Sequence, residues 1–475
     1  MKYKPTIGLE IHAELKTRTK MFCNSKNDPD EKVPNTNVCP ICMGHPGTLP
    51  VINKEAVRHI LRLGIAVNGT IADFTEFDRK NYFYPDLPKG YQISQYKFPL
   101  VRGGTLNDIQ LTRVHLEEDT ARSQHLPEVG EEGTYSLVDF NRAGVPLMEL
   151  VTEPVITNAK DAAAFARELQ LLLRYLGAGE ANMEKGEMRV EANISVSAEK
   201  RLGTKVEIKN LNSFRSVEKA IAFEIERHAA VLLRGEKIVQ ETRGWDEVRQ
   251  MTYSQRLKEE SHDYRYLPDP DLPKLYISEI KEFNKATLQK NMPELPSEKR
   301  GRYERDLGIK KEDAQVFVEE ESLRKLFEET IAFHPEDKRY AQTAANYITS
   351  DLVGLMRISD ENTLHNVTPE AFSKLISMTR AGEISSRGAK DILSILYSDG
   401  GDPKTIAEAH SLFQKSDISE LKILVQKVIE ENTSVAEEYR KGKEASLNFL
   451  LGQAMKKSKG SANPTLLRKI LQEKI

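Results

Sequence analysis

A strict alternation of apolar and polar residues recurs in several short segments of the chain. In residues 7–15 the two alternating sets are Ile7, Leu9, Ile11, Ala13 and Leu15, and Gly8, Glu10, His12 and Glu14. The pattern returns over residues 187–196 and 204–209. Successive side chains of a β-strand point to opposite faces, so each segment predicts a strand with one apolar face. Together they predict an antiparallel sheet with a single apolar face.

The polar face of this predicted sheet carries acids beside basic groups. Glu10 and His12 share one segment, and Glu187, Arg189 and Glu191 share another. Such short mixed-sign clusters favour a functional face, and the alternative is an ordinary face exposed to water.

Further acids lie among aliphatic residues between positions 115 and 154. One run reads His115-Leu116-Glu117-Glu118-Asp119, and Glu149 lies in the run Val145-Pro146-Leu147-Met148-Glu149-Leu150-Val151. A buried unpaired charge costs on the order of several kcal/mol, so such acids must be neutralised, paired or bound to a cation. We predict a divalent metal here; the alternative is an edge strand whose acids face water.

The remaining chain is predicted to be largely helical after a mixed first part. Helices are expected over 162–176 and 216–234, each followed by a glycine, and from residue 293 onward the pattern is charged and helical with a break at 399–403. A length of 475 residues fits roughly three domains. We predict an α+β protein: an antiparallel-sheet catalytic domain over 1–293, an all-α domain over 294–402 and a small α-helical tail domain over 403–475.

Two loops combine aromatic rings, basic groups and prolines. They span residues 78–92 and 263–273, and each contains the sequence Asp-Leu-Pro. These are ingredients for stacking a base and binding phosphate, although aromatic residues that fill a small core under a loop are the alternative.

Charge and composition indicate which part of the chain could contact nucleic acid and argue against a membrane-spanning segment. The net charge is −3, so contact with nucleic acid must come from a local patch, and residues 440–475 carry nine Lys or Arg against two Glu. This tail is the candidate for RNA contact, with a solvated helix face as the alternative. Apolar runs are too short to span a membrane, and three cysteines without a secretion signal predict a cytoplasmic protein.

Several common catalytic motifs are missing from the sequence. There is no P-loop, dinucleotide-binding glycine motif, nucleophile elbow or His-Glu-x-x-His. The acids with one histidine on strands suit magnesium, which prefers oxygen ligands and bridges phosphates. The residues by themselves therefore indicate magnesium-dependent phosphoryl chemistry.

A longer set of motifs resembles one known family. In chain order they lie at residues 8–12, 39–42, 79–88, 115–119, 141–147, 207–213, Lys258-Glu259, 263–266, 452–455 and 462–464. This ordered set resembles the B-subunit family of the aspartyl/glutamyl-tRNA(Asn/Gln) amidotransferases, and it extends along the whole chain.

The resemblance implies that the chain is an enzyme and indicates its reaction. ATP with Mg²⁺ would phosphorylate the side-chain carboxylate of Glu-tRNA(Gln) and/or Asp-tRNA(Asn), and ammonia would then displace the phosphate to give the amide. Ammonia would come from glutamine through the amidase (A-subunit) partner, with the small C-subunit as the third member of the complex, in the bacterial cytoplasm. No membrane or DNA is implied. The alternatives are a tRNA-binding scaffold without catalysis and a free-standing ligase that uses free ammonia.

The resemblance also implies site residues. The catalytic set is Glu10, His12, Glu117, Glu118 and Glu149. Magnesium would lie on Glu10, His12, Glu149 and one acid of the Glu117/Glu118 pair, for which we choose Glu118. ATP or substrate would contact Lys80, Asn81, Tyr82, Lys209 and Arg265.

Two positions depart from the family pattern. Many members have two cysteine pairs that hold zinc, but here Ser25 takes the place of one cysteine, which leaves Cys23, Cys39 and Cys42. Structural zinc normally has four protein ligands, so we expect a metal-free loop, with zinc completed by His45 or water as the alternative. Leu267 stands where an aromatic residue is usual, which weakens a stacking role there.

Overall fold

The computed structural model describes residues 3–28, 30–125, 135–199, 201–257, 264–359, 364–414, 418–458 and 462–475. The chain divides into two compact units, Met1–Leu295 and Pro296–Ile475. The motif Lys258-Glu259 and the first residue of the 263–273 loop lie outside the described residues.

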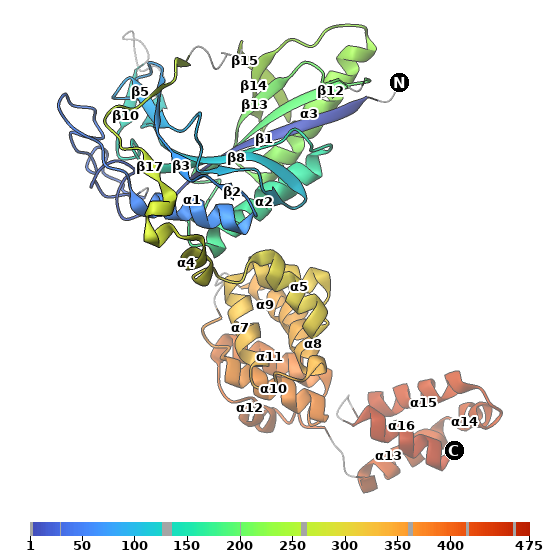
Figure 1. Ribbon diagram of the computed structural model, residues 1–475. Helices are drawn as coiled ribbons and strands as arrows, with labels where there is room; N and C mark the ends of the chain where they lie inside the picture. The colour runs from blue at the N-terminus through green and yellow to red at the C-terminus, as the bar shows by residue number, and fades with distance from the viewer. Residues whose placement is uncertain are drawn as a thin grey trace. The chain divides into compact units, whose positions relative to one another are not determined.

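The first unit is built on a ten-stranded sheet (Figure 1). Its strand order is β15 (Met251–Leu257), β14 (Glu241–Asp246), β13 (Val206–Leu211), β12 (Met188–Ser197), β1 (Lys4–Glu14), β11 (Pro146–Thr152), β8 (Ile109–Glu118), β6 (Val101–Arg102) and β2 (Thr70–Ile71), with β7 (Thr105–Leu106) paired to β8. All pairs are antiparallel except β13 with β14. The predicted antiparallel sheet is therefore confirmed.

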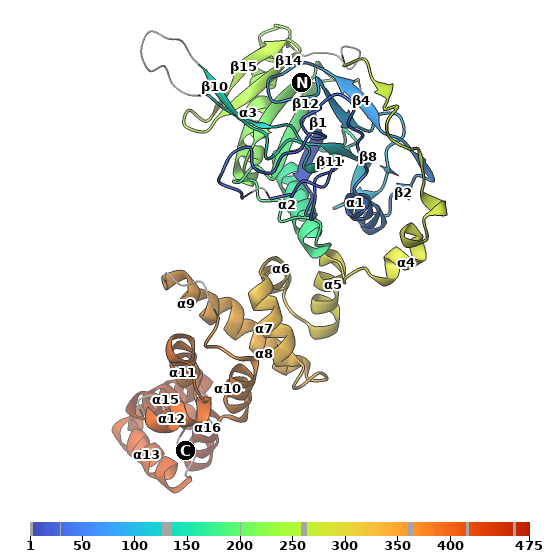
Figure 2. The same ribbon diagram turned by 90° about the vertical axis from the view of Figure 1, so that its left-hand side faces the viewer.

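The apolar face of the sheet packs against helices α1 (Lys54–Ala66), α2 (Ala159–Tyr175) and α3 (Phe214–Leu233). Ile7, Leu9 and Ile11 of β1 are almost completely buried in this core. β1 lies near the middle of the sheet, between β12 and β11 (Figure 2). Its alternate residues, including Glu10 and His12, therefore lie on the opposite, polar face.

The two predicted helices of this unit begin slightly earlier than expected. The side chain of Asn158 accepts a hydrogen bond from the Asp161 N–H at the start of α2, and Ser213 does the same for Ser216 in α3. These cap residues satisfy free N–H groups at the helix start, so they set the beginning of each helix.

Three small sheets flank the large one. They are β16 (Leu267–Pro268), β4 (Asp78–Asn81) and β5 (Tyr91–Ser94); β10 (Ser136–Asp139) with β9 (Arg122–His125); and β17 (Leu275–Tyr276) with β3 (Phe74–Thr75). The two aromatic loops of the sequence meet in the first of these, where Leu267 pairs with Arg79. Arg79 Nε also donates to Asp269 Oδ2 at 2.8 Å, so an ion pair fastens the second loop to β4.

The first unit ends with short helices, η2 (Ile277–Glu279), η3 (Lys281–Phe283) and α4 (Lys285–Lys290). The described part of the second unit is helical, as predicted. Its helices are α5 (Pro296–Leu307), α6 (Lys311–Glu319), α7 (Glu321–Ile331), α8 (Lys338–Asn346), η4 (Tyr347–Leu352), α9 (Val353–Ile358), α10 (Pro369–Ala381), α11 (Ser386–Asp399), α12 (Pro403–Ala409), α13 (Ile418–Glu431), α14 (Thr433–Arg440), α15 (Glu444–Lys457) and α16 (Pro464–Lys474).

The packing of the second unit can be compared with the predicted domain boundary after residue 402. Helix α12 follows that break and still contacts α10 and α11. The last four helices, α13 to α16, share an apolar cluster of their own that begins at Leu421. The three-domain division stays a prediction. None of the described helices combines the length and the apolarity needed to cross a membrane.

Candidate metal and phosphate site

Three neighbouring strands bring five titratable side chains together on the polar face of the large sheet. His12 of β1 pairs with Glu149 of β11, which in turn pairs with His115 of β8. His12 Nε2 lies 3.5 Å from Glu149 Oε2, 3.6 Å from Glu117 Oε1 and 3.9 Å from Glu10 Oε1. One imidazole nitrogen is thus surrounded by three carboxylates.

Glu117 and Glu118 point to different surroundings because they are consecutive residues of one strand. Glu117 faces His12 and accepts a hydrogen bond from Ser94 Oγ at 3.1 Å. Glu118 instead pairs with Lys89 and accepts from the Ile93 N–H at 2.9 Å. Glu117, and not Glu118, therefore lies beside His12, and the metal ligand among these two acids stays a prediction.

The electrostatics of the cluster favour a positive charge at its centre. Burial alone would lower the pKa of His12, but its hydrogen bond with Glu149 and the charges of Glu117, Glu149 and Glu10 raise it to about 9. Burial and the charge of Glu149 raise the pKa of Glu10 to about 7. Without a metal ion, these acids therefore hold a proton on the imidazole.

Two overlapping triads have the spacing of a metal site. Glu10, His12 and Glu149 form one, His115, Glu117 and Glu149 form the other, and the ligand atoms within each triad lie within 4.8 Å of one another. Burial lowers the pKa of His115 to about 4, so its imidazole is neutral and able to donate a lone pair. The carboxylates are the hard oxygen donors that Mg²⁺ prefers, so the residues present fit a divalent cation.

A cavity of about 180 Å³ lies over the cluster. Its lining combines acidic, basic and polar groups, namely Glu10, His12, Lys80, Tyr82, Gln92, Glu117, Asp119, Thr120, Leu147, Arg189, Glu191, Lys209 and Asn210. Lys209 Nζ is 3.0 Å from Glu191 Oε2, and Arg189 is paired with Asp119 at 3.1 Å. In the described part of the chain, the Lys80 ammonium group contacts no carboxylate and no hydrogen-bond acceptor.

Lys80 remains charged although it lies among buried groups. Burial lowers the pKa of its amine, but the negative charges near it, above all that of Glu117, raise the pKa above its ordinary value. An ammonium group without a hydrogen-bonded partner, beside a site for a divalent cation, suits an anionic ligand such as a phosphate.

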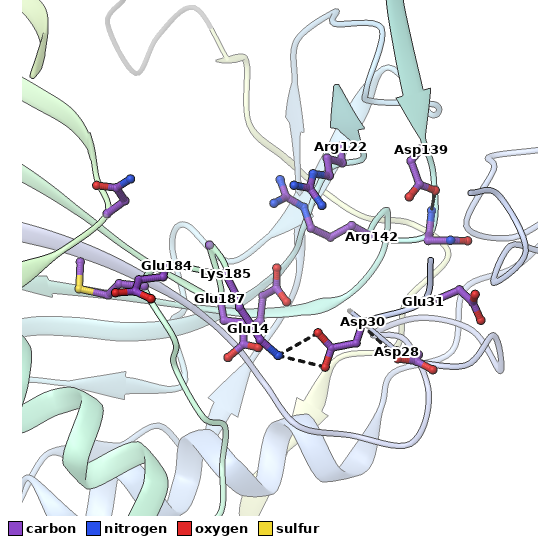
Figure 3. A pocket seen from close by; sticks show the side chains of 14 residues that line it. Glu14, Asp28, Asp30, Glu31, Arg122, Asp139, Arg142, Glu184, Lys185 and Glu187 are labelled. Carbon is purple, nitrogen blue, oxygen red and sulfur yellow. Dashed lines mark hydrogen bonds and ion pairs between the residues drawn. The ribbon is translucent and has the colours of Figure 1, made fainter. Parts of the chain in front are cut away.

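A second cavity of about 300 Å³ lies next to this site, and Glu14 and Arg142 are among the residues that line it (Figure 3). Lys185 Nζ pairs there with Asp30 Oδ1 at 2.9 Å. Arg142 Nε is also 3.4 Å from Asp119, which lines the first cavity. A chain of charges therefore connects the two cavities.

Glu14 belongs to this chain of charges. Burial and the adjacent Asp119 raise the pKa of Glu14 to about 8. Burial alone would also raise the pKa of Asp119, but Arg189 and Arg142 lower it. Asp119 therefore carries the negative charge of this pair.

Only some of the residues predicted to bind ATP or substrate line the first cavity. Lys80, Tyr82 and Lys209 line the first cavity. Asn81 does not, because its side-chain amide donates to the Arg265 carbonyl at 2.8 Å. The side chain of Arg265 is exposed. A direct contact of Asn81 or Arg265 with a substrate stays a prediction.

Several residues of the site were absent from the predicted set. They are Asp119, Arg189, Glu191, His115 and Arg113, whose guanidinium is 3.1 Å from Glu149 Oε1. The alternation of side chains along the strands could have identified most of them. Arg113, His115 and Glu117 are spaced by two on one strand, as are Arg189 and Glu191 on another.

The three cysteines form a separate cluster. The sulfur atoms of Cys23, Cys39 and Cys42 lie within 4.8 Å of one another, and all three cysteines are free. The fully buried Lys20 donates to the Phe140 carbonyl at 3.1 Å and approaches Cys42 Sγ at 3.9 Å. A hydrogen bond from Cys23 and the charge of Lys20 outweigh burial and lower the pKa of Cys42 to about 4. The cluster thus offers three sulfur donors with an ammonium group beside them.

The fold and the site together define an antiparallel-sheet protein with buried carboxylates and imidazoles arranged for a divalent cation. Residues 5–281 match the family described as "GatB/GatE catalytic domain", and residues 310–475 match the family described as "GatB domain". The chain belongs to the family of B subunits of the aspartyl/glutamyl-tRNA(Asn/Gln) amidotransferases, which confirms the resemblance seen in the sequence motifs.

Full-length relatives agree with this assignment. The aspartyl/glutamyl-tRNA(Asn/Gln) amidotransferase B subunit of Gloeothece citriformis is 43% identical over 100% of this chain and 98% of its own length. The proteins of the same name from Synechocystis sp. and Thermomicrobium roseum are each 44% identical, over 99% and 100% of this chain and 97% and 99% of their own lengths.

Proposed function

We propose that this chain is the activating subunit of a tRNA-dependent amidotransferase. It would use ATP to phosphorylate the side-chain carboxylate of glutamate on tRNA(Gln), of aspartate on tRNA(Asn), or of both. The observation that supports this most directly is the free Lys80 ammonium group beside the cluster of Glu10, His12, Glu117 and Glu149. The names of the relatives supply the substrate class.

The chemistry requires activation because a carboxylate is a poor electrophile and has no good leaving group. Transfer of the terminal phosphoryl group of ATP to a carboxylate oxygen gives ADP and an acyl phosphate. The nitrogen of ammonia then bonds to the carbonyl carbon, the bond to the phosphate oxygen breaks, and a proton leaves the nitrogen. Amide, phosphate and ADP are the products.

The residues of the chain have separate roles in this proposal. Glu10, His12, Glu117 and Glu149 would hold Mg²⁺, which when bound neutralises charge on the phosphate oxygens. Lys80 would donate to a phosphate oxygen, whereas Lys209 and Arg189 line the same cavity as the ion-pair partners of Glu191 and Asp119. Burial alone would raise the pKa of Glu149, but the protonated His12 and Arg113 hold it well below the ordinary value, so Glu149 would stay ionised.

The partners follow from the same proposal. The relatives are named as B subunits, so the chain would work with an amidase that releases ammonia from glutamine and with a small third subunit. Aminoacyl-tRNA substrates and the three free cysteines fit a cytoplasmic location. Zinc is given no part in the proposed reaction, and at the cysteine cluster Lys20 places a positive charge beside Cys42.

ADP release tests the proposal. The purified chain is mixed with its partner subunits, Mg²⁺ and ATP, with and without Glu-tRNA(Gln) or Asp-tRNA(Asn). ADP that forms only with a misacylated tRNA supports the activating role. Bound tRNA without any ADP would favour a scaffold role instead, and amidation by the chain alone with ammonium salts would favour a free-standing ligase.

A further inference from the structure

Aromatic rings surround the free ammonium group of Lys80. Lys80 Nζ lies 4.8 Å from the ring centroid of Tyr264 and 5.8 Å from that of Tyr82. Tyr264 also makes edge-to-face contacts with the rings of Tyr82 and Tyr266, at centroid distances of 5.9 and 6.2 Å. Tyr266 in turn stacks on Tyr96 at 4.3 Å. The rings thus form one connected group beside the cavity.

The backbone of the Tyr264 segment is held in an uncommon conformation. Arg265 has a φ of 42°, in the left-handed region that residues other than glycine rarely adopt. Asn81, the neighbour of Lys80 on β4, donates its side-chain amide to the carbonyl oxygens of Arg265 at 2.8 Å and Tyr264 at 3.4 Å. The same strand therefore carries Lys80 and fixes the segment that covers it.

We propose that Tyr264 is a positioning residue for Lys80: its ring face holds the Lys80 ammonium group at the cavity, and Asn81 fixes the ring in place. The proposal rests on the proposed function, because the ligand that Lys80 would then receive is a phosphate oxygen of ATP or of the acyl phosphate.

An aromatic ring can hold the Lys80 ammonium group at the cavity and leave it able to bind an anion, which a carboxylate cannot do. A carboxylate in contact with Lys80 would take up its N–H donors and cancel its charge. The face of an aromatic ring attracts a cation through its electron density and leaves the charge in place. The ammonium group can then direct its N–H groups into the cavity toward an anion.

Acetylation of Lys80 tests this arrangement without relying on catalysis. The full-length chain is treated briefly with acetic anhydride, and the modified fraction of Lys80 is measured by mass spectrometry. In Tyr264→Leu the amine loses its cover and the stabilisation of its charged form, so Lys80 should react about 2-fold to 30-fold faster. Tyr264→Phe keeps the ring and should react at the wild-type rate.

Two further variants make the result specific. Asn81→Ala releases the segment and should raise the acetylation rate in the same direction as Tyr264→Leu. Tyr96→Leu removes a ring that stacks on Tyr266 without contacting Lys80, and it should leave the rate unchanged. An unchanged rate in Tyr264→Leu, or an equal increase in Tyr96→Leu, would overturn the proposal.

Kinetics in the assembled complex provide the second measurement. ADP formation should show a KM for ATP that is about 2-fold to 30-fold higher in Tyr264→Leu, with the wild-type value restored in Tyr264→Phe. Equal KM values in Tyr264→Leu and the wild type would count against the proposal. If the wild-type complex forms no ADP, the proposed function fails, while the acetylation rates still decide whether Tyr264 positions Lys80.

Discussion

At the scale of single residues, the site depends on which side of a strand each carboxylate occupies. Glu117 and Glu118 are chemically identical neighbours, yet one contacts His12 and the other pairs with Lys89. Glu149 is the most connected acid, because it lies within 3.5 Å of His12, His115 and Arg113. It also belongs to both metal-type triads.

Replacement of Glu149 by glutamine should therefore stop the proposed chemistry and spare tRNA binding. Glutamine keeps the size of the side chain but removes the charge that a metal ion needs. We expect ADP formation to fall by at least about 100-fold, with tRNA affinity near the wild-type value. Glu153→Gln is the matched control, because Glu153 accepts from Thr112 Oγ1 outside the cluster. A Glu149→Gln enzyme that turns over ATP normally would contradict the metal assignment.

The imidazole of His12 should make stability depend on pH when divalent cations are removed. Its pKa is raised from 6.5 to about 9, so the folded state binds this proton more tightly than the unfolded state. The resulting stability is fully present below pH 6.5 and is lost as the pH rises through 9. We expect the unfolding free energy in EDTA to fall over this range by on the order of 3 kcal/mol at most.

Urea unfolding between pH 6 and 10 measures this effect. His12→Asn should flatten the pH profile, whereas substitution of the exposed His45 by asparagine should leave it as in the wild type. Added Mg²⁺ should also flatten it, because the metal takes the place of the proton. Identical profiles for the wild type and His12→Asn would show that His12 is not the titrating group.

At the scale of elements, one buried acid joins helix α3 to the far end of the large sheet. Glu224 of α3 is completely buried, and its carboxylate accepts hydrogen bonds from Arg227 of the same helix and from Thr252 of β15. Arg243 of β14 approaches it to 3.3 Å. Burial alone would raise the pKa of Glu224, but hydrogen bonds from His228, Arg227 and Thr252 lower it to about 2.

Replacement of Glu224 by alanine should destabilise the first unit strongly. The change leaves the guanidinium of Arg227 and the hydroxyl of Thr252 without their acceptor, and loss of one partner of a buried pair costs about 3–5 kcal/mol. Urea unfolding monitored by circular dichroism measures the difference. Glu226→Ala, on the exposed side of the same helix, should change stability by less than about 0.5 kcal/mol. Equal stabilities of the two variants would contradict this role.

At the scale of the whole molecule, the residues of the candidate site and the basic residues of the tail belong to different parts of the chain. The candidate site lies within Met1–Leu295, and the excess of Lys and Arg lies within residues 440–475. Helices α13 to α16 share one apolar cluster, so removal of residues 418–475 deletes a whole cluster without cutting through another.

Removal of residues 418–475 should weaken tRNA binding and make it less dependent on salt. The slope of log K against log[salt] is negative, and each phosphate contact that is lost should reduce its magnitude by about 0.7–0.9. ADP formation at saturating tRNA should be retained, because every residue of the candidate site remains. Filter binding at several salt concentrations measures the slope. An unchanged affinity and slope would rule out the tail as an RNA-binding element.

Much of the local structure could be predicted from the sequence. Alternation identified the faces of β1 and β12, and the glycines that follow α2 and α3 marked their ends. The same pattern placed Glu10 and His12 on a polar face. These features depend on neighbours a few residues apart, so a local pattern is sufficient to read them.

Which of these residues lie in contact depends on how the strands pair in the folded chain. Pairing of β1 with β11 and of β11 with β8 brings His12, Glu149 and His115 together from distant parts of the chain. The hydrogen bond from Asn81 to the carbonyl of Tyr264 likewise spans 183 residues. The character of each strand face and of each helix end can be predicted from the sequence, because side-chain direction and capping are local properties. Strand order and register determined the site, because they follow from burial of the whole apolar face at once.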